Sequence, residues 1–203
     1  MRVKKNGKTN SPKRAGEEKM SNCVMGSFTD PRDKKVYKTV KIGSQVWLAE
    51  NLAYNATGSR YYKDEPAKYA IYGKLYDLHT AINNACPPGW HLPTDAEWQT
   101  LVAYAGGSYI AGKRLKARSG WKYYKGISST DNFCFTALPG GFLNSVGTFR
   151  YDGRDGRWWS NSEGDDDKPY AYGMVFHDKG DKVRPLSRDE VKDFFCSIRC
   201  VQD

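Results

Sequence analysis

The sequence predicts a single α+β domain that combines two helices with short antiparallel strands and long loops. At 203 residues, the chain has the length of one domain and is long enough to bury a hydrophobic core. Aromatic residues make up 14% of it, and it contains 20 glycines and 9 prolines, a mix typical of turn-rich α+β domains. No apolar run reaches the roughly 18 residues that a membrane span needs, so we expect no membrane span.

The first 25 residues differ in composition from the rest, and we expect a disordered basic tail over 1–25 followed by one domain over 26–203. Residues 1–19 carry seven Lys or Arg and two Glu, a net charge of +5 (7 − 2), which leaves +4 of the total +9 for the remainder. The tail has neither the aromatic residues nor the motifs of nucleic-acid-binding segments, so we expect no nucleic-acid partner. It also lacks the apolar stretch of a signal peptide.

The first half of the predicted domain contains a hairpin and a helix. Residues 36–42 alternate and are β-branched, Gly43-Ser44 suits a tight turn, and 45–49 supply the returning strand. A long surface loop over 55–68, rich in Gly, Ser, Tyr and Lys, follows. Apolar residues at helical spacing over 72–82 then predict a helix of about 10 residues, in which His79 faces the core.

The segment over 94–107 carries the strongest helix signal in the chain. Thr94 stands at the N-cap position, and Glu97 three residues later completes a capping box. Apolar residues from Trp98 to Ala105 recur at helical spacing, and Gly106-Gly107 ends the segment. We therefore predict the second helix here.

The second half of the chain reads as a series of short strands. Residues 133–138 are predicted to form a strand that stops at Pro139, and 142–152 a hairpin that bends at 145–147. Further strands are expected from residue 157, over 170–176, over 182–184 and over 194–201. Strand alternation in the last of these places Cys196, Ile198 and Cys200 on one face.

Five motifs in order carry a resemblance to a known family. They are Lys41 to Leu52, Cys86 to Trp98 (CPPGWHLPTDAEW), Ala137 to Gly141, Trp158 to Ser160 and Ser197 to Val201. From about Gly26 to Asp203 the chain closely resembles the Fibrobacter succinogenes major paralogous domain family. The Leu92–Trp98 motif is also similar to the helix of formylglycine-generating enzymes, whose fold is an elaborated C-type lectin. The resemblance therefore implies a C-type lectin-like fold.

The five cysteines include no C-x-x-C pair and the three histidines are scattered, so no zinc site is expected. The family resemblance implies a disulfide between Cys86 and Cys200. Cys134 and Cys196 depart from the family pattern, and their joint presence suggests a second disulfide, with two buried free thiols as the alternative and Cys23 left over. Two disulfides would imply an oxidising compartment, so we expect a secreted or cell-surface location although no signal peptide is visible.

Two metal sites have a basis in the sequence. Cys196 and Cys200 resemble the pair that holds copper in formylglycine-generating enzymes, and thiolates suit Cu(I). However, three residues separate them here instead of four, and the implied disulfide already uses Cys200. The acidic run of Glu163, Asp165, Asp166 and Asp167 could offer oxygen ligands to Ca²⁺, but it lacks the motifs of sugar-binding lectins. A solvated loop is therefore favoured, and no resident cofactor is expected.

A cluster of Arg, Tyr, Trp and Asp after Gly141 is the candidate ligand-binding face. Such residues supply a large contact area and bidentate hydrogen bonds and are enriched in binding hot spots. In some relatives with a C-type lectin-like fold, the matching C-terminal strands and loops contact the ligand. Trp158 and Trp159 alternate on a strand, so we expect one of them in the core. The candidate residues are Arg150, Asp152, Arg154, Asp155, Arg157, Trp158, Tyr172, Phe176, His177 and Arg184.

We therefore expect a non-catalytic domain that binds a protein or a glycan through its C-terminal loops. A copper-dependent cysteine oxidase is the first alternative, and a structural surface or adhesion module is the second. The sequence assigns neither the ligand nor the oligomeric state.

Overall fold

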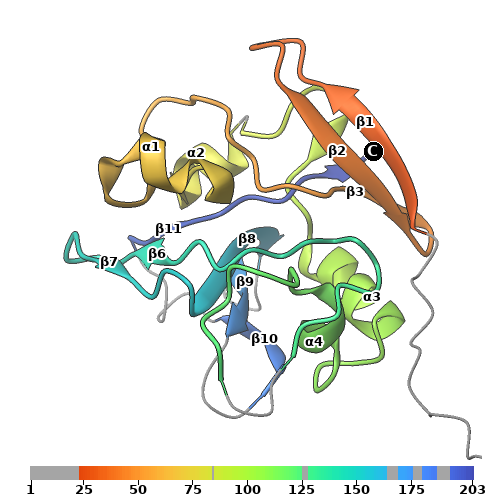
Figure 1. Cartoon of the computed structure of the whole chain (residues 1–203). Coiled ribbons are helices and arrows are strands. Elements are labelled where there is room, and N and C mark those ends of the chain that lie inside the picture. Colours follow the sequence, from red (N-terminus) through yellow and green to blue (C-terminus); the bar gives the residue numbers. More distant parts are fainter. Residues whose placement is uncertain (1–22, 84, 125–127, 164–168, 176–179, 187–192) are drawn as a thin grey trace, which may run out of the picture.

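The computed structural model of the chain describes residues 23–83, 85–124, 128–163, 169–175, 180–186 and 193–203 (Figure 1). Its strands are β1 (Val24–Thr29), β2 (Val36–Ile42), β3 (Gln45–Leu48), β4 (Tyr76–Asp77), β5 (Trp90–His91), β6 (Phe142–Leu143), β7 (Phe149–Arg150), β8 (Asp155–Glu163), β9 (Pro169–Val175), β10 (Val183–Leu186), β11 (Phe195–Cys196) and β12 (Val201–Gln202). Its helices are η1 (Tyr62–Asp64), α1 (Pro66–Tyr69), η2 (Ala70–Tyr72), α2 (Leu78–Ile82), α3 (Asp95–Tyr104) and α4 (Ala111–Leu115). The α+β class is confirmed.

Three antiparallel sheets organise these strands, in the orders β1-β2-β3-β12-β5, β10-β9-β8 and β4-β11-β6-β7. The predicted hairpin of β2 and β3 is present, and Val201 of β12 lies opposite Trp47 of β3 and His91 of β5. The last strand therefore pairs with the hairpin near the start of the domain. Within the described residues, no helix combines the length and the apolar character that crossing a membrane requires.

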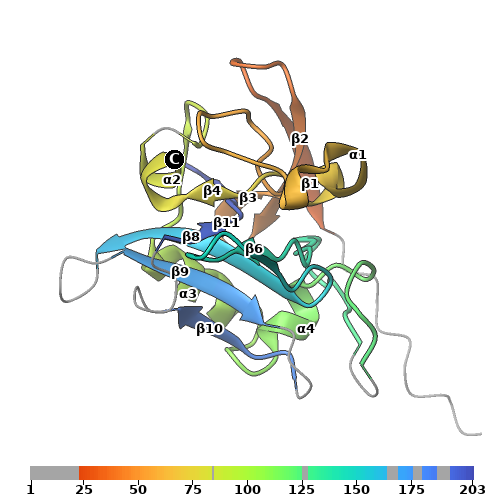
Figure 2. The ribbon, with the colours of Figure 1, turned by 90° about the vertical axis from the view of Figure 1, so that its left-hand side faces the viewer.

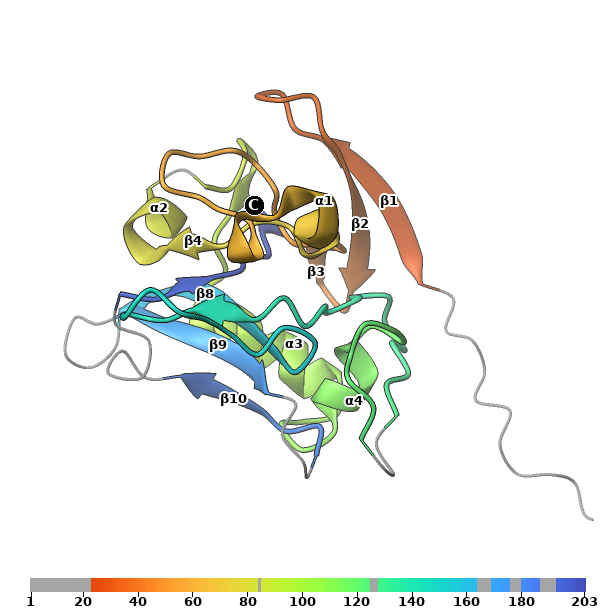
Figure 3. The same cartoon turned by 60° about the vertical axis from the view of Figure 1, so that its left-hand side comes forward.

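Strand β8 runs between the two halves of the molecule. Strands β1 to β3 with α1 and α2 lie above it, and α3, α4, β9 and β10 lie below it (Figures 1 and 3), while Figure 2 shows β8 and β9 side by side. Successive side chains of a strand point to opposite faces. Trp158 accordingly packs with Trp47, Trp98 and Phe135 in one core cluster, whereas Trp159 belongs to a second cluster. Both tryptophans are buried, so the core takes not just the one that was expected there but also the other.

Helix α3 forms as its sequence predicts. The Thr94 hydroxyl accepts from the backbone N–H of Glu97, and the Glu97 carboxylate accepts from the backbone N–H of Thr94, which completes the capping box. The Trp98 side chain then points toward β8, where its Nε1 donates to the carbonyl of Trp159 at 3.4 Å. The cap thus fixes the start of the helix and with it the position of a large core residue.

The helix predicted over 72–82 divides into three elements instead. Gly73 has a φ of +72°, which ends η2, and Tyr76 then pairs with Cys196 in β4 and β11. Asp77 caps the short helix α2 by accepting from the N–H of Thr80 at 2.8 Å. His79 is exposed in this arrangement, which corrects the expectation that it faces the core.

The strand predicted over 133–138 does not form. Cys134 and Thr136 both have a positive φ, which is incompatible with a regular strand. The Asp131 carboxylate accepts from the backbone N–H and from the hydroxyl of Thr136, both at 2.9 Å, so a side chain takes the hydrogen bonds that a neighbouring strand would offer. Only Ala137 joins a strand-like bridge, to Lys116.

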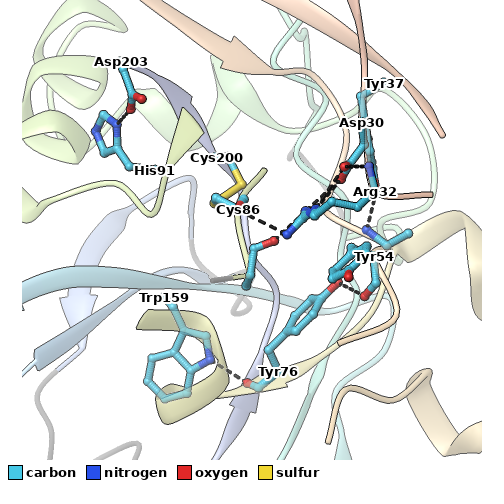
Figure 4. The surroundings of a disulfide bond; sticks show 12 residues. Asp30, Arg32, Tyr37, Tyr54, Tyr76, Cys86, His91, Trp159, Cys200 and Asp203 are labelled. Atoms are coloured by element: carbon cyan, nitrogen blue, oxygen red, sulfur yellow. Dashed lines mark hydrogen bonds and ion pairs between the residues drawn. A yellow bond between two sulfur atoms is a disulfide. The ribbon is translucent and has the colours of Figure 1, made fainter. Parts of the chain in front are cut away.

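The disulfide between Cys86 and Cys200 is confirmed (Figure 4). It links the segment before β5 to the segment before β12. The expected disulfide between Cys134 and Cys196 is wrong, because Cys134 is bonded to Cys23 and Cys196 is a buried free cysteine. The reason is spatial, since Cys134 packs against the core cluster around Trp47 whereas Cys196 lies inside the other cluster.

The Cys23–Cys134 disulfide also corrects the start of the folded domain. Strand β1 begins at Val24 and pairs with β2 along its whole length, from Val24 opposite Lys41 to Thr29 opposite Val36. The boundary expected at residue 26 therefore lies inside a strand, and residues 1–22 of the expected tail lie outside the described residues.

The strand predicted over 194–201 contains a break that places Arg199 in the core. Strands β11 and β12 are separated by 197–200, and Arg199 is fully buried there. Its guanidinium donates to Oδ1 of Asn51 and to the carbonyls of Leu48, Phe135 and Thr136. Burial lowers the pKa of Arg199 to about 9.

Candidate functional site

Three of the predicted ligand-binding residues gather at the end of β7 and in the turn that follows. The N–H groups of Arg154 and Asp155 both donate to the carbonyl of Tyr151 at 2.9 Å, and Tyr151 itself has a φ of +62°. This tight turn projects Arg150, Tyr151 and Arg154 into solvent, while Asp152 is half-buried.

A second loop lies against this turn. The N–H of Lys122 donates to the carbonyl of Gly153 at 2.6 Å, and the exposed fractions of the neighbouring Tyr123 and of Tyr151 are 84% and 44%. We call the exposed surface formed by Lys122, Tyr123, Arg150, Tyr151 and Arg154 the tyrosine–arginine face. The structure thus adds Lys122, Tyr123 and Tyr151 to the residues that the sequence singled out.

Three other predicted residues serve the scaffold instead of a surface. Asp155 and Trp158 are buried, because bridges from Gly156 to Gly141 and from Trp158 to Ser197 cover this part of β8 with other segments. Arg157 pairs with Asp155 at 3.0 Å, and its guanidinium lies 3.7 Å from the ring centre of Phe142. The expectation that Asp155 and Trp158 contact a ligand is therefore corrected.

Of the four remaining predicted residues, Arg184 and Tyr172 lie on other strands than the one that leads into the tyrosine–arginine face. Arg184 lies on β10, which is separated from β8 by β9, and its Nη1 donates to the carbonyl of Pro185. Tyr172 lies on β9 opposite Trp158 and Pro185. Phe176 and His177 lie outside the described residues.

A tyrosine-rich segment over 60–74 adjoins the face, and most of it falls within the surface loop that the sequence predicts over 55–68. The ring centre of Tyr62 lies 4.9 Å from that of Tyr69 and 5.0 Å from that of Phe149, and the Tyr62 hydroxyl donates to Oδ1 of Asp152 at 3.1 Å. Burial first, and then the charge of Asp152, raise the pKa of Tyr62 well above its usual value. The alternation of Tyr with Lys and Arg was the signal that could have marked this segment.

A cavity of about 430 Å³ lies beside this segment. Its volume falls within the range of small-molecule sites. We call it the basic pocket. Its lining residues are Gly58, Ser59, Arg60, Tyr61, Asp64, Lys74 and Phe195.

Two cationic side chains line the basic pocket. Only 6% of Lys74 is exposed; its Nζ donates to Oδ1 of Asn55 at 2.8 Å and lies 4.4 Å from the ring centre of Tyr61. Burial lowers the pKa of Lys74. Arg60 donates through Nε to Oδ1 of Asp64 at 3.1 Å. The pocket therefore brings two cations, one carboxylate and an aromatic ring together.

A second cavity, of about 520 Å³, lies near the Cys86–Cys200 disulfide. The arginine that lines this cavity, Arg32, already has partners within the protein. It pairs with Asp30 at 2.7 Å and donates to the carbonyls of Ala85 and Cys86 (Figure 4). Its guanidinium also lies over the ring of Tyr54, 3.7 Å from the ring centre. Arg32 thereby connects the β1–β2 loop to the disulfide. The residues that line this second cavity are Arg32, Tyr54, Ala56, Thr57, Asp77, His79, Thr80 and Asn83.

The residues expected as copper or calcium ligands do not form a metal site within the described residues. Cys200 is held in a disulfide, so only Cys196 of the copper-binding pair retains a thiol, and burial raises its pKa to about 12. Glu163 ends β8, while Asp165, Asp166 and Asp167 lie outside the described residues. Within the part of the chain that is described, no three His, Cys, Asp or Glu side chains are grouped to hold a metal ion.

Comparison with known proteins identifies one family. The family model described as the Fibrobacter succinogenes major domain matches residues 40–202. No curated protein and no solved structure matches the chain. The matched region begins inside β2 and ends in β12, so Cys23 and β1 precede it.

Proposed function

The chain belongs to the Fibrobacter succinogenes major domain family, and from that premise we propose that it is a non-catalytic binding module for an acidic protein or glycan. The tyrosine–arginine face is its contact surface. The observation that carries the proposal is the projection of exposed Tyr123 and Tyr151 beside Arg150 and Arg154 from two loops that are hydrogen-bonded to each other. Tyr and Arg are enriched in binding hot spots because they combine contact area with directed hydrogen bonds.

The charge of this face supports an acidic ligand. Lys122, Arg150 and Arg154 contribute +3, and the adjoining Asp152 contributes −1, which leaves +2. The Asp152 carboxylate is also turned toward Tyr62, whose hydroxyl donates to it. A surface with excess positive charge accelerates association with anionic partners and makes that association sensitive to salt.

The loops that carry the face are held in place by the scaffold. The backbone N–H of Gly153 donates to the carbonyl of Pro139 and its carbonyl accepts from Lys122, while Tyr62 packs on Phe149 just before Arg150. A surface that is already ordered loses less conformational entropy when it binds. This ordering suits a recognition module.

The cysteines argue against the copper-oxidase alternative, because the disulfide to Cys86 removes the Cys200 thiolate. Two disulfides also support a secreted or cell-surface location, since disulfides persist in oxidising compartments. A structural or adhesion module, the remaining alternative, would show no discrete affinity for a soluble ligand.

On the same proposal the fold is C-type lectin-like. The support is the pairing of the last strand with the hairpin near the start of the domain, together with the Cys86–Cys200 disulfide that joins the approach to α3 with that strand. This arrangement leaves the loops between β6 and β8 at the surface.

The test is binding of the full chain to an array of acidic glycans, neutral glycans and acidic peptides. The variant Arg150→Ala/Tyr151→Ala/Arg154→Ala is expected to lose at least about tenfold in affinity for at least one acidic species that the wild type binds. A matched control is Tyr109→Ala/Lys182→Ala, since these two residues form another exposed aromatic–cation pair on a different surface, 5.3 Å apart. Equal binding by wild type and triple variant, or preference for neutral species, would contradict the proposal.

A further inference from the structure

The basic pocket has a chemistry of its own, and we propose that it binds the carboxylate of an acidic sugar, a hexuronate. This inference goes beyond the proposed function, because none of the residues that line the pocket belongs to the tyrosine–arginine face. It rests on the environment of Lys74 and Arg60.

Among the described residues Lys74 is a buried cation that makes no ion pair, and the charge of Asp64 acts on it only from a distance. An ammonium group has three N–H donors, and among the described residues only the neutral Asn55 side chain accepts one of them. The Tyr61 ring covers another part of the charge at 4.4 Å. A buried charge is costly unless it is paired, so an anion that enters the pocket is attracted to Lys74 Nζ.

Arg60 supplies the second cation in the lining of the pocket. It uses Nε for Asp64, and within the described part of the chain no acceptor engages its terminal amino groups. These groups present parallel N–H donors, a geometry that matches a carboxylate. Arg60 also lies over the rings of Phe149 and Phe195, at 5.8 and 5.9 Å, which holds its side chain against the wall.

The two cations are fixed beside each other by the backbone. Arg60 and Leu75 exchange two hydrogen bonds, at 2.8 and 3.0 Å, so Lys74 is held next to Arg60. Gly73 has a φ of +72°, and a Cβ there would lie 2.6 Å from the carbonyl of Leu52. Only glycine fits this approach, and the N–H of Lys74 then donates to the same carbonyl at 2.9 Å. The site is therefore pre-organised.

The carboxylate of Asp64 favours an acidic sugar over a small inorganic anion. It lines the same pocket, and only its Oδ1 has a partner among the described residues. A compact dianion such as phosphate would be repelled by it, whereas sugar hydroxyls donate to it. The Tyr61 ring adds an apolar surface of the kind on which sugar rings pack. The cavity of about 430 Å³ also exceeds the needs of a lone oxyanion.

The proposal is tested by calorimetric titration of the full chain with sodium trigalacturonate, its fully methyl-esterified form and inorganic phosphate. The ester keeps the sugar and removes the charge. We expect trigalacturonate to bind at least about tenfold more tightly than the ester, the loss typical of a missing charged hydrogen bond. Equal binding of acid and ester, phosphate binding as tight as the acid, or no heat from the acid at millimolar concentration would each overturn the proposal.

Variants assign the binding to this pocket. Lys74→Met and Arg60→Gln are each expected to weaken trigalacturonate binding at least about tenfold. The matched control is Lys68→Met, because Lys68 is exposed and lies over Tyr69 outside the pocket. If Lys74→Met does not fold, Arg60→Gln decides alone, since Arg60 is half-exposed. Wild-type affinity in Arg60→Gln would contradict the assignment.

The triple variant Arg150→Ala/Tyr151→Ala/Arg154→Ala separates this inference from the proposed function. It leaves every residue that lines the basic pocket in place. It is therefore expected to keep the trigalacturonate affinity of the wild type even where it loses array ligands. A loss of trigalacturonate binding in this variant would move the acid site to the tyrosine–arginine face and overturn the inference.

Discussion

Arg199 in the core and Lys74 in the basic pocket are both almost fully buried cations, but their surroundings differ in kind. Arg199 donates to the Asn51 side chain and to three backbone carbonyls from distant segments. Lys74 donates to one exposed neutral side chain, that of Asn55. In the first case the donors hold the fold together. In the second most of them remain available, which is why we assign structure to the one and ligand binding to the other.

Among the contacts that hold the fold together, the Cys86–Cys200 disulfide is expected to contribute most to stability. Cys86→Ser/Cys200→Ser opens a loop with a sequence separation of 114 residues, and we expect the free energy of unfolding to fall by about 4–5 kcal/mol in the chain-entropy model. Urea unfolding followed by tryptophan fluorescence measures it.

The natural control is Cys23→Ser/Cys134→Ser, because that disulfide has a nearly equal separation of 111 residues. Loop entropy alone predicts nearly equal losses for the two pairs. A smaller loss for the Cys23–Cys134 pair would show that β1 separates from the sheet before the core unfolds. A loss below about 1 kcal/mol for the Cys86–Cys200 pair would contradict the role assigned to it.

Removal of the buried guanidinium is the next largest effect. Arg199→Leu leaves the carbonyls of Leu48 and Phe135 without their donor, and we expect a loss of roughly 3–4 kcal/mol in stability. Chemical denaturation measures it, with Arg154→Leu as the exposed control, for which a change within about 0.5 kcal/mol is expected. Similar losses in the two variants would show that the hydrogen bonds of Arg199 contribute little.

The Arg199 site also shows which parts of the fold the sequence could predict. Helix α3 and the β2–β3 hairpin were predicted because their signals are local, namely the Thr94 capping box and the Gly43-Ser44 turn. The Cys86–Cys200 disulfide was predicted from the family resemblance. The burial of Arg199 was not predicted, because strand alternation cannot show that both faces of a segment are covered by other segments.

Contacts that helix and strand patterns do not encode explain the other differences between sequence and structure. The bond from Cys134 to Cys23 joins segments 111 residues apart, and the Asp131 carboxylate replaces the strand partner that 133–138 was expected to have. The candidate site residues likewise divide into those identified from the sequence and those identified only from the fold. Arg150 and Arg154 lie four residues apart in the sequence and were identified, whereas Lys74 became a candidate only when folding placed it beside Arg60 and Tyr61.

A smaller effect is expected from His91, whose ring bridges Asp203 and Glu97 at 2.7 and 2.9 Å. Burial lowers the pKa of His91, but hydrogen bonds to Asp203 and Glu97 outweigh it and raise the pKa above the usual 6.5. Because the pKa is higher in the folded state, the stabilisation is complete below about pH 6.5. It is lost as the pH rises through the folded-state pKa.

His91→Gln should therefore be less stable than the wild type at about pH 6, and the difference should be smaller at about pH 8. The difference is expected to stay below about 1 kcal/mol, since the groups are partly exposed. Urea midpoints at the two pH values measure it. His79→Gln is the control, because His79 is exposed and its ring makes no ion pair among the described residues. Parallel pH profiles for His91→Gln and the wild type would refute the bridge.

The smallest effect on stability is expected from Lys74→Met. This variant tests directly whether Lys74, unlike Arg199, is dispensable for the fold. Methionine keeps the length of the aliphatic chain and removes a buried charge. Within the described residues, the acceptor left behind is Oδ1 of Asn55, an exposed residue that can bind water. Replacing a buried ion with an apolar side chain is often neutral or stabilising, so we expect a change within about 0.5 kcal/mol in the free energy of unfolding. Chemical denaturation of Lys74→Met and Arg199→Leu side by side measures both. If Lys74→Met lowered the free energy of unfolding as much as Arg199→Leu, Lys74 would also hold the fold together. The assignment of the basic pocket as a binding site would then be contradicted.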